Sequence, residues 1–372
     1  MTTVLGRRAL NRALLERQML LGRRTASVDE ALEHLVGMQA QAPLAPYVGL
    51  WSRLEGFRQD DLSERVADRR AVRAMAMLRG TIHLLTAQDA LALRPVLQQV
   101  LERAYRSSPF ARNVDGLDLA EVLTAGREAL EARPQTVALL ARRLGERWPD
   151  RDTVSLSYAV RYLVPLVQIP PRGLWGATGP ATLATLESWV DRPLGTIADP
   201  DAFVLRYLAA YGPATVADIG TWSWLTGLRD VVERLRPSLR IFRDEDGREL
   251  FDVPDGARPD PDLPAPVRFL PEYDNALLSH SDRTRIVPRG RKVPLPPGNG
   301  AAIGTFLVDG FLRGTWRINR GDAVATITIE PDTALSHADR TALEEEGDRL
   351  LRFAAADVPE RAVRFIAIPE RG

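Results

Sequence analysis

The sequence predicts an α+β fold in which three tandem winged-helix (helix-turn-helix) motifs precede a small antiparallel, β-barrel-like domain. Two observations predict it. Three successive stretches each show helical segments followed by a short pair of strands, which is the winged-helix order. After a linker rich in Pro and Asp at 254–266, residues 267–330 show mainly strand patterns. Helix-plus-hairpin units also occur as simple packing modules, so one alone proves little, whereas three in series argue for a shared architecture.

The first unit is assigned to residues 1–112. Its helices are expected at 7–21, 28–37 and 61–68. Ser27 and Glu30 have the spacing of a capping box at the start of the second helix. A strand is expected over 75–85, and Thr86 then opens a further helix.

The second unit is assigned to 113–198 and the third to 199–256. In the second, helices are expected at 118–132, 136–147 and 155–164, and strands at 166–169 and 174–176 flank a Pro-Pro-Arg-Gly turn. In the third, helices are expected at 202–211, 215–224 and 228–235, and strands at 239–243 and 249–253 flank Asp-Glu-Asp-Gly.

The last domain is assigned to 257–372, with a basic hairpin near its start. Strands are expected at 267–270, 303–308, 311–318 and 323–329, followed by a helix at 338–355 and a strand at 362–368. Asp309-Gly310 is a tight-turn sequence between two of these strands, which favours an antiparallel, barrel-like sheet.

Composition excludes several classes of chemistry. The 372 residues include no cysteine, which excludes disulfides, thiolate zinc sites, iron–sulfur clusters and cysteine nucleophiles. Only four histidines are present, so we expect no metal and no cofactor. No apolar run approaches the ~18 residues needed to span a bilayer. The arginines of the first 24 residues are spread through a helical pattern, unlike a signal peptide, so we expect a cytoplasmic protein without a membrane partner. We also expect the protein to be a monomer.

Charge is unevenly distributed although the formal net charge is zero. Residues 1–112 hold 17 basic and 11 acidic residues, 113–200 hold 9 and 11, and 268–320 hold 9 and 4. Two basic regions therefore flank a slightly acidic middle, as expected if both contact one anion, although ordinary solvated surface gives the same pattern. Lys292 is the only lysine, so a side-chain amine nucleophile would have to be this residue.

Two glutamines that no apolar face requires follow the second predicted helix, in Met38-Gln39-Ala40-Gln41-Ala42-Pro43. On a helix, residues two apart point about 200° away from each other. Pro43 disfavours helical geometry at the residue before it, and an extended chain would aim Gln39 and Gln41 in one direction. From spacing alone, an ordinary polar helix end explains the pair as well.

The Gln-Ala-Gln sequence resembles the glutamine–apolar–glutamine motif of the AlkZ-type winged-helix DNA glycosylases. Further similar segments follow in the same order along nearly the whole chain: 77–84, 270–280, Asp282-Arg283 and 308–316. The resemblance implies three winged helices and a small β-barrel-like domain in a C shape around DNA. It also implies removal of N7-alkylated purines, including azinomycin-type interstrand crosslinks, from double-stranded DNA.

Under this resemblance Gln39 and Gln41 would place the attacking water and stabilise the transition state. Residues expected to contact DNA are Arg79, His83, His280, Arg283, Arg285, Arg289, Arg291, Lys292 and Arg313. His83 fits a structural role as well as a phosphate contact, and the run from His280 to Lys292 fits either a basic hairpin in a DNA groove or a solvated loop. Trp175, Trp222, Trp224 and Trp316 are expected in the core.

The expected activity is that of a monofunctional DNA glycosylase, which hydrolyses the N-glycosidic bond and leaves an abasic site. It would serve base excision repair or self-resistance to an alkylating antibiotic. The main alternative is a non-enzymatic winged-helix transcriptional regulator, which would bind undamaged duplex tightly at a particular sequence. A third reading is a resistance factor that sequesters a DNA-alkylating metabolite without DNA.

Overall fold

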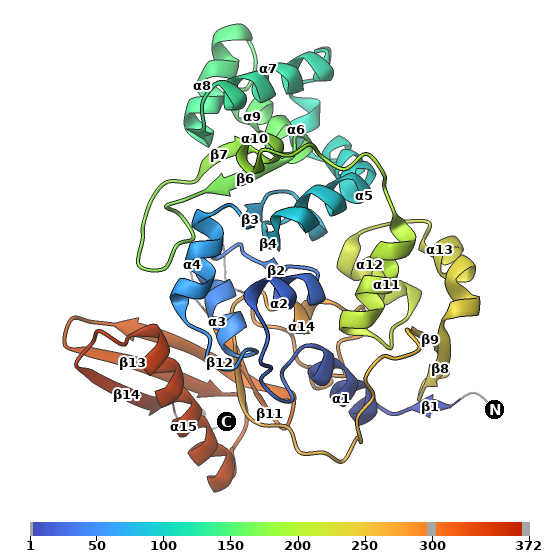
Figure 1. Cartoon of the computed structure of the whole chain (residues 1–372), viewed down its shortest axis with the longest axis vertical. Coiled ribbons are helices and arrows are strands. Elements are labelled where there is room, and N and C mark those ends of the chain that lie inside the picture. Colours follow the sequence, from blue (N-terminus) through green and yellow to red (C-terminus); the bar gives the residue numbers. More distant parts are fainter. Residues whose placement is uncertain (1–2, 296–302, 367–372) are drawn as a thin grey trace.

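The computed structural model describes residues 3–295 and 303–366. The molecule is elongated, with helices α7 (Leu119–Ala132), α8 (Val137–Arg147) and α9 (Thr153–Leu163) at one end and a five-stranded sheet at the other (Figure 1). The described strands form three sheets, and helices surround them, which makes the fold α+β as predicted. No helix within the described ranges has the length and apolar character to cross a membrane.

The first unit contains the expected helices and one that sequence patterns did not predict. The helices are α1 (Arg7–Arg17), α2 (Val28–His34), α3 (Ala45–Trp51) and α4 (Gln59–Ala67). The predicted capping box at the start of α2 is present: the Ser27 side chain accepts from the Glu30 amide, and the Glu30 carboxylate accepts from the Ser27 amide. The short helix α3 directly follows the two glutamines and was missed.

The strand predicted over 75–85 is wrong. The chain forms two antiparallel strands, β3 (Ala71–Ala74) and β4 (His83–Thr86), joined by a turn. Three residues of this turn have left-handed backbone angles, namely Ala76 (φ 48°), Arg79 (φ 54°) and Gly80 (φ 65°). A run of alternating apolar residues therefore reverses direction where the sequence pattern predicts that it continues.

The second and third units also have three helices followed by an antiparallel strand pair. In the second unit β6 (Leu166–Ile169) pairs with β7 (Thr182–Thr185), so the strand predicted at 174–176 is wrong. The third unit consists of α11 (Pro200–Tyr211), α12 (Val216–Ser223), α13 (Leu228–Leu235), β8 (Arg240–Asp244) and β9 (Glu249–Asp252), close to the predicted bounds.

The hairpins of the first two units join into one sheet. Its strand order is β2-β4-β3-β6-β7-β5, where β2 is Met38–Gln39 and β5 is Gln135–Thr136. Arg73 on β3 is paired with Gln168 on β6, which connects the units. Helices α5 (Ala87–Arg106), α6 (Pro109–Arg112) and α10 (Leu186–Val190) complete this half, while β1 (Val4–Leu5) pairs with β8 in a separate three-stranded sheet.

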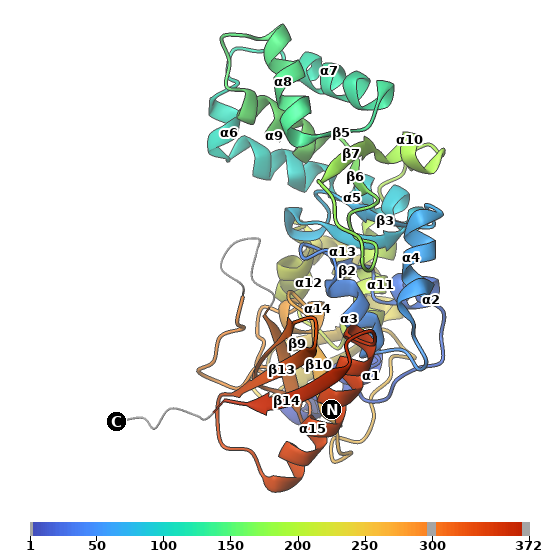
Figure 2. The ribbon, with the colours of Figure 1, turned by 90° about the vertical axis from the view of Figure 1, so that its left-hand side faces the viewer.

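The last domain is an open mixed sheet rather than the predicted antiparallel barrel. Its order is β10 (Arg268–Leu270), β11 (Gly304–Val308), β12 (Phe311–Arg320), β13 (Val324–Pro331) and β14 (Glu360–Phe365). The described strands β10 and β14 end the order, and β14 runs parallel to β13 because helix α15 (His337–Ala354) crosses over between them and packs beside the sheet (Figure 2). Residues 367 and 368 of the predicted last strand lie outside the described residues.

Candidate functional site

The glutamine segment is held extended at the edge of the six-stranded sheet. After α2 the chain reverses through left-handed Val36 (φ 54°) and Gly37 (φ 82°). It then enters β2, where Gln39 is paired with His83, and the Ala40 amide donates to the Ile82 carbonyl at 2.8 Å. The prediction that residues around Gln39 leave helical geometry is confirmed.

The two glutamine side chains nevertheless line different cavities. Gln39 is 8% exposed. It borders a cavity of about 10 Å³, which holds no more than one water molecule. Gln41 is partly exposed and borders a cleft of about 330 Å³. The described residues that line these two spaces do not overlap, so the two side chains border separate cavities in this conformation.

Arg79 fixes the Gln39 side chain. Its Nη2 donates to Gln39 Oε1 at 2.8 Å and to Asn275 Oδ1 at 2.9 Å, and its Nη1 donates to the Trp222 carbonyl at 3.1 Å. Because arginine has no acceptor, the amide oxygen of Gln39 must face it. Burial lowers the pKa of Arg79 to about 10, which still leaves the guanidinium charged at neutral pH.

Arg79 and His83 therefore act inside the protein, in contrast to the predicted DNA contacts. The Arg79 donors are used by Gln39, Asn275 and Trp222. His83 is fully buried, and burial lowers its pKa well below the usual value, so the ring is neutral. Its Nδ1 lies 3.4 Å from Thr81 Oγ1. A neutral imidazole can still donate one hydrogen bond, but this ring is fully buried and is not accessible to a phosphate in this conformation.

His280 and Arg285 are buried as well. His280 is 1% exposed, and its Nε2 lies 3.0 Å from the Tyr211 carbonyl. Burial, with the nearby Arg285 cation, lowers the pKa of His280 to about 3. Arg285 is 5% exposed and donates to the Pro213 carbonyl at 2.7 Å. These two residues support the loop from within, and in this conformation their burial leaves little of either side chain accessible to a DNA phosphate.

The other predicted DNA contacts stay at least partly accessible. Arg289 and Lys292 are exposed, whereas Arg283, Arg291 and Arg313 are partly exposed. Arg291 pairs with Asp332 at 2.8 Å. The segment that carries four of them forms turns rather than a hairpin over the described residues 279–295.

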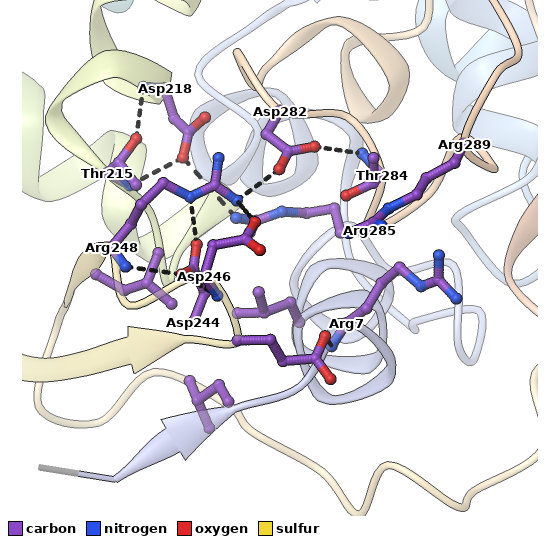
Figure 3. Close-up of a pocket in the computed structure, with 14 residues that line it drawn as sticks. Arg7, Thr215, Asp218, Asp244, Asp246, Arg248, Asp282, Thr284, Arg285 and Arg289 are labelled. Atoms are coloured by element: carbon purple, nitrogen blue, oxygen red, sulfur yellow. Dashed lines mark hydrogen bonds and ion pairs between the residues drawn. The ribbon is translucent and has the colours of Figure 1, made fainter.

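A cavity of about 470 Å³ beside this loop is rich in carboxylates (Figure 3). Arg248 lies at its centre and bonds Asp244 at 2.6 Å, Asp246 at 3.1 Å and Asp282 at 2.6 Å. These ion pairs clamp the β8–β9 turn to the loop after α14 (Asn275–Leu278). With its carboxylates already paired, this cavity suits neither a phosphate nor a metal, and within the described ranges no group of three potential ligands is arranged for a metal ion.

The cleft beside Gln41 has the opposite character. None of the described residues that line it is Asp or Glu. The lining includes two arginines and two tyrosines, Arg161, Arg172, Tyr158 and Tyr162. A Cβ on Gly80, the residue after Arg79, would collide with the Tyr162 hydroxyl, so the Arg79 turn and α9 are in close contact. The cleft therefore combines a partly exposed glutamine with two cations and tyrosine hydroxyls.

Sequence analysis missed most of these groups, although a signal existed. Tyr158, Arg161 and Tyr162 are spaced i, i+3 and i+4 on a predicted helix, which places them on one face. Glu272, within a segment that resembles the family, was given no role. Burial raises the pKa of Glu272, which borders a further cavity of about 520 Å³ together with Ala42 and Arg172.

Three of the tryptophans expected in the core are buried to different degrees, and one is not buried. Trp222 is fully buried and Trp316 is 7% exposed, while Trp175 is partly exposed. Trp224 is 44% exposed, with a left-handed φ of 64° at the end of α12. The prediction of a core position is wrong for Trp224, which directly follows the last residue of α12.

Comparisons with known proteins agree with this architecture. A family model described as "DNA glycosylase AlkZ-like" matches residues 32–353. An interstrand DNA cross-link repair glycosylase of Streptomyces sahachiroi is 24% identical over 381 residues, which cover 95% of this chain and 97% of that protein. The solved structure of Streptomyces sahachiroi DNA glycosylase AlkZ superimposes with a TM-score of 0.72 at 20% identity, over 98% of this chain and 100% of that one. This structural likeness shows a shared fold.

Proposed function

Because the chain belongs to the AlkZ-like DNA glycosylase family, we propose that it hydrolyses the N-glycosidic bond of N7-alkylated purines in double-stranded DNA. The observation that carries the proposal is the placement of Gln41 in a cleft lined by arginines and by no carboxylate among the described residues. Such a cleft attracts the DNA backbone and holds a hydrogen-bonding amide where the backbone would lie.

Hydrolysis of the glycosidic bond of an N7-alkylated purine requires few catalytic groups from the protein. Alkylation at N7 makes the purine cationic, so the base leaves without prior protonation and positive charge develops at C1′ of the sugar. What remains is to hold a water molecule against C1′. An amide side chain can accept from and donate to that water. We assign the role of holding this water molecule to the side chain of Gln41.

Gln39 has a different proposed role. Its oxygen is held by Arg79 and its cavity accommodates no more than one water molecule, so we assign it to positioning the extended segment that presents Gln41. This changes the expectation that both amides share one target. Gln39 contributes to hydrolysis by fixing the backbone two residues before the reacting amide.

The units of three helices and a strand pair are proposed to be winged helices over 1–112, 113–198 and 199–256, with the sheet domain over 257–372. Their arrangement in a C shape around the duplex is part of the same proposal. DNA contacts are proposed for the accessible cations Arg283, Arg289, Arg291, Lys292 and Arg313. The protein is proposed to act as a monomer, within base excision repair or self-resistance, and crosslinks of the azinomycin type are proposed as further substrates.

Incubating the purified protein with duplex that contains N7-methylguanine tests the activity. The proposal predicts free N7-methylguanine and an abasic site that breaks only after alkali. A duplex with an N7-linked interstrand crosslink, run in parallel, shows whether crosslinks are substrates. Tight binding of one undamaged sequence without base release would instead support a transcriptional regulator, and direct drug binding without DNA would support a sequestering factor.

Borohydride trapping tests the monofunctional mechanism. Strand-nicking glycosylases form a Schiff base with an amine, and Lys292, an exposed residue of the loop after α14, is the only lysine. We expect no borohydride-stable protein–DNA adduct with the wild type. An adduct that disappears in Lys292→Gln would contradict hydrolysis by water.

A further inference from the structure

Three arginines around the Gln41 cleft have no carboxylate partner. In the described part of the chain, no hydrogen bond or ion pair joins the Arg161 guanidinium to another residue, and its Nε is buried without a partner. Arg172 donates one hydrogen bond, to the Gly179 carbonyl at 3.2 Å. Arg73, behind them, is 2% exposed and bonds the Gln168 side chain at 2.9 Å and the Pro43 carbonyl at 3.3 Å.

This concentration of positive charge is costly without an anion. Burial lowers the pKa of Arg161, and burial together with the nearby Arg172 lowers the pKa of Arg73 to about 10. Buried charges in proteins are normally paired, because their desolvation costs several kcal/mol per ion. Several buried arginines of this chain have a carboxylate partner, such as Arg53 with Asp274 at 2.8 Å, whereas Arg79 is held by three neutral oxygens. Among the described residues that line the cleft no carboxylate is present, so an anion that binds there would neutralise the guanidinium groups of Arg161 and Arg172.

The aromatic groups of the cleft do not offer a stacking surface for a base. Tyr158 stacks on Phe110 with ring centroids 4.0 Å apart and on Tyr162 with centroids 5.4 Å apart. Tyr162 in turn places its hydroxyl against Gly80. These rings are already engaged with each other and with the Arg79 turn, so what the cleft presents is guanidinium and amide donors. Such donors recognise phosphate oxygens.

We propose that Arg161 and Arg172 together clamp one phosphodiester of the damaged strand, adjacent to the nucleotide whose C1′ faces Gln41. The inference rests on the proposed function, because it takes DNA as the ligand. The two arginines come from α9 and from the loop after β6, so the second unit binds the backbone while the first unit presents Gln41. A glycosidic bond is thereby held in register with the amide.

The test measures binding of a fluorescein-labelled undamaged duplex over a range of salt concentrations for wild type, Arg161→Ala and Arg172→Ala. Because the two arginines share one phosphate, each alanine variant should make the slope of log K against log salt shallower by at most about 0.9. Binding near 0.1 M salt should weaken roughly tenfold. Arg161→Lys, which keeps the charge, should retain most of the slope. The matched control is Arg142→Ala, which removes an arginine whose side chain is 78% exposed and pairs with Glu146 on the same unit.

A second measurement identifies the phosphate. Neutral methylphosphonates are placed one at a time around an N7-methylguanine in the duplex. With the methylphosphonate at the clamped position, Arg161→Ala should bind the duplex as tightly as the wild type does. With the methylphosphonate at any other position, Arg161→Ala should bind more weakly than the wild type, as it does with unmodified duplex. Unchanged slopes in both alanine variants, or slopes that fall equally in Arg142→Ala, would overturn the clamp. Slowed base release with unchanged slopes would also overturn it, because the arginines would then act on the base. Absence of base release by the wild type would refute the proposed function and not the clamp.

Discussion

At the scale of single residues, Arg79 shows how an internal contact can resemble a binding residue in the sequence. Its φ of 54° is a conformation that costs a non-glycine residue of order 1–3 kcal/mol. The cost is offset because one guanidinium bridges Gln39, Asn275 and the Trp222 carbonyl. The partners Gln39 and Asn275 lie 40 and 196 positions away, so no local pattern reveals them.

Replacing Arg79 by lysine tests its positioning role. A single ammonium cannot reach three acceptors in the plane of a guanidinium, so Arg79→Lys should lose about 2 kcal/mol of unfolding free energy in urea. The rate of base release should fall roughly tenfold while DNA affinity stays within twofold. Arg69→Lys is the control, because Arg69 also has a left-handed φ (63°) but is exposed. Weakened DNA binding with an unchanged rate would contradict this role.

Two buried histidines predict how stability depends on pH. Burial lowers the pKa of His83 well below its usual value and that of His280 to about 3. Below about pH 6.5 the unfolded chain takes up protons that the folded protein does not, so stability falls as pH falls. Each histidine contributes at most about 1.4 kcal/mol per pH unit.

Urea unfolding between pH 7.5 and 5.5 measures this slope. His83→Leu removes one proton acceptor and should flatten the slope, whereas His337→Gln, at an exposed position, should leave it unchanged. A slope equal to that of the wild type in His83→Leu would mean that His83 is not kept neutral by the fold.

At the scale of elements, the turn between α2 and β2 determines where the glutamines lie. Gly37 has a φ of 82°, and a Cβ there would collide with the Leu85 side chain on β4. Gly37→Ala should therefore lower the free energy of unfolding by about 1–3 kcal/mol more than backbone strain alone would. It should also slow base release, because it displaces β2. Gly56→Ala is the matched control, because Gly56 has a φ of 67° and nothing within 4 Å of the added carbon. Equal losses of unfolding free energy in both variants would contradict the packing argument.

Element boundaries set by local bonds were predictable, and those set by pairing were not. Helices begin as expected where a side chain caps the first turn, as at Ser27, Thr86 and Thr136, because these bonds span three residues. The strands predicted at 75–85 and 174–176 were wrong because alternating or apolar residues do not specify a partner. The second of these stretches forms turns near Tyr47, whose hydroxyl donates to the Gly173 carbonyl at 2.9 Å.

At the scale of the whole molecule, buried ion pairs hold together segments far apart in sequence. Arg53, two residues after the end of α3, and Asp274, just before α14, form two hydrogen bonds at 2.9 and 2.8 Å across 221 positions, with both side chains 1% exposed. This pair joins the segment after the glutamines to the start of α14, whose first residue is Asn275. It connects a residue of the first unit to a residue of the last domain.

Breaking that pair should destabilise the protein strongly. Arg53→Met leaves a buried carboxylate unpaired and should lose about 3–5 kcal/mol in chemical unfolding. The double variant Arg53→Met/Asp274→Asn, which also removes the charge, should recover part of that loss. A double variant whose loss of unfolding free energy equals the sum for Arg53→Met and Asp274→Asn would show that the guanidinium and the carboxylate do not interact in solution.

The series of repeated units was predictable from the sequence, whereas the strand pairings that connect these units were not. The order of helices and strand pairs follows from local periodicity, whereas the shared six-stranded sheet depends on the pairing of Arg73 with Gln168, 95 positions apart. The parallel addition of β14 to β13, which excludes the antiparallel barrel predicted for this domain, likewise depends on how α15 packs.

The central claim is that Gln41, held beside a cationic cleft, places the water that hydrolyses the glycosidic bond. Single-turnover release of N7-methylguanine by the wild type, Gln41→Ala and the double variant Gln39→Ala/Gln41→Ala measures it most directly. The account predicts a loss of at least about 100-fold in Gln41→Ala, no release in the double variant, and duplex affinity within about threefold of the wild type. Base release by Gln41→Ala at the wild-type rate would contradict it.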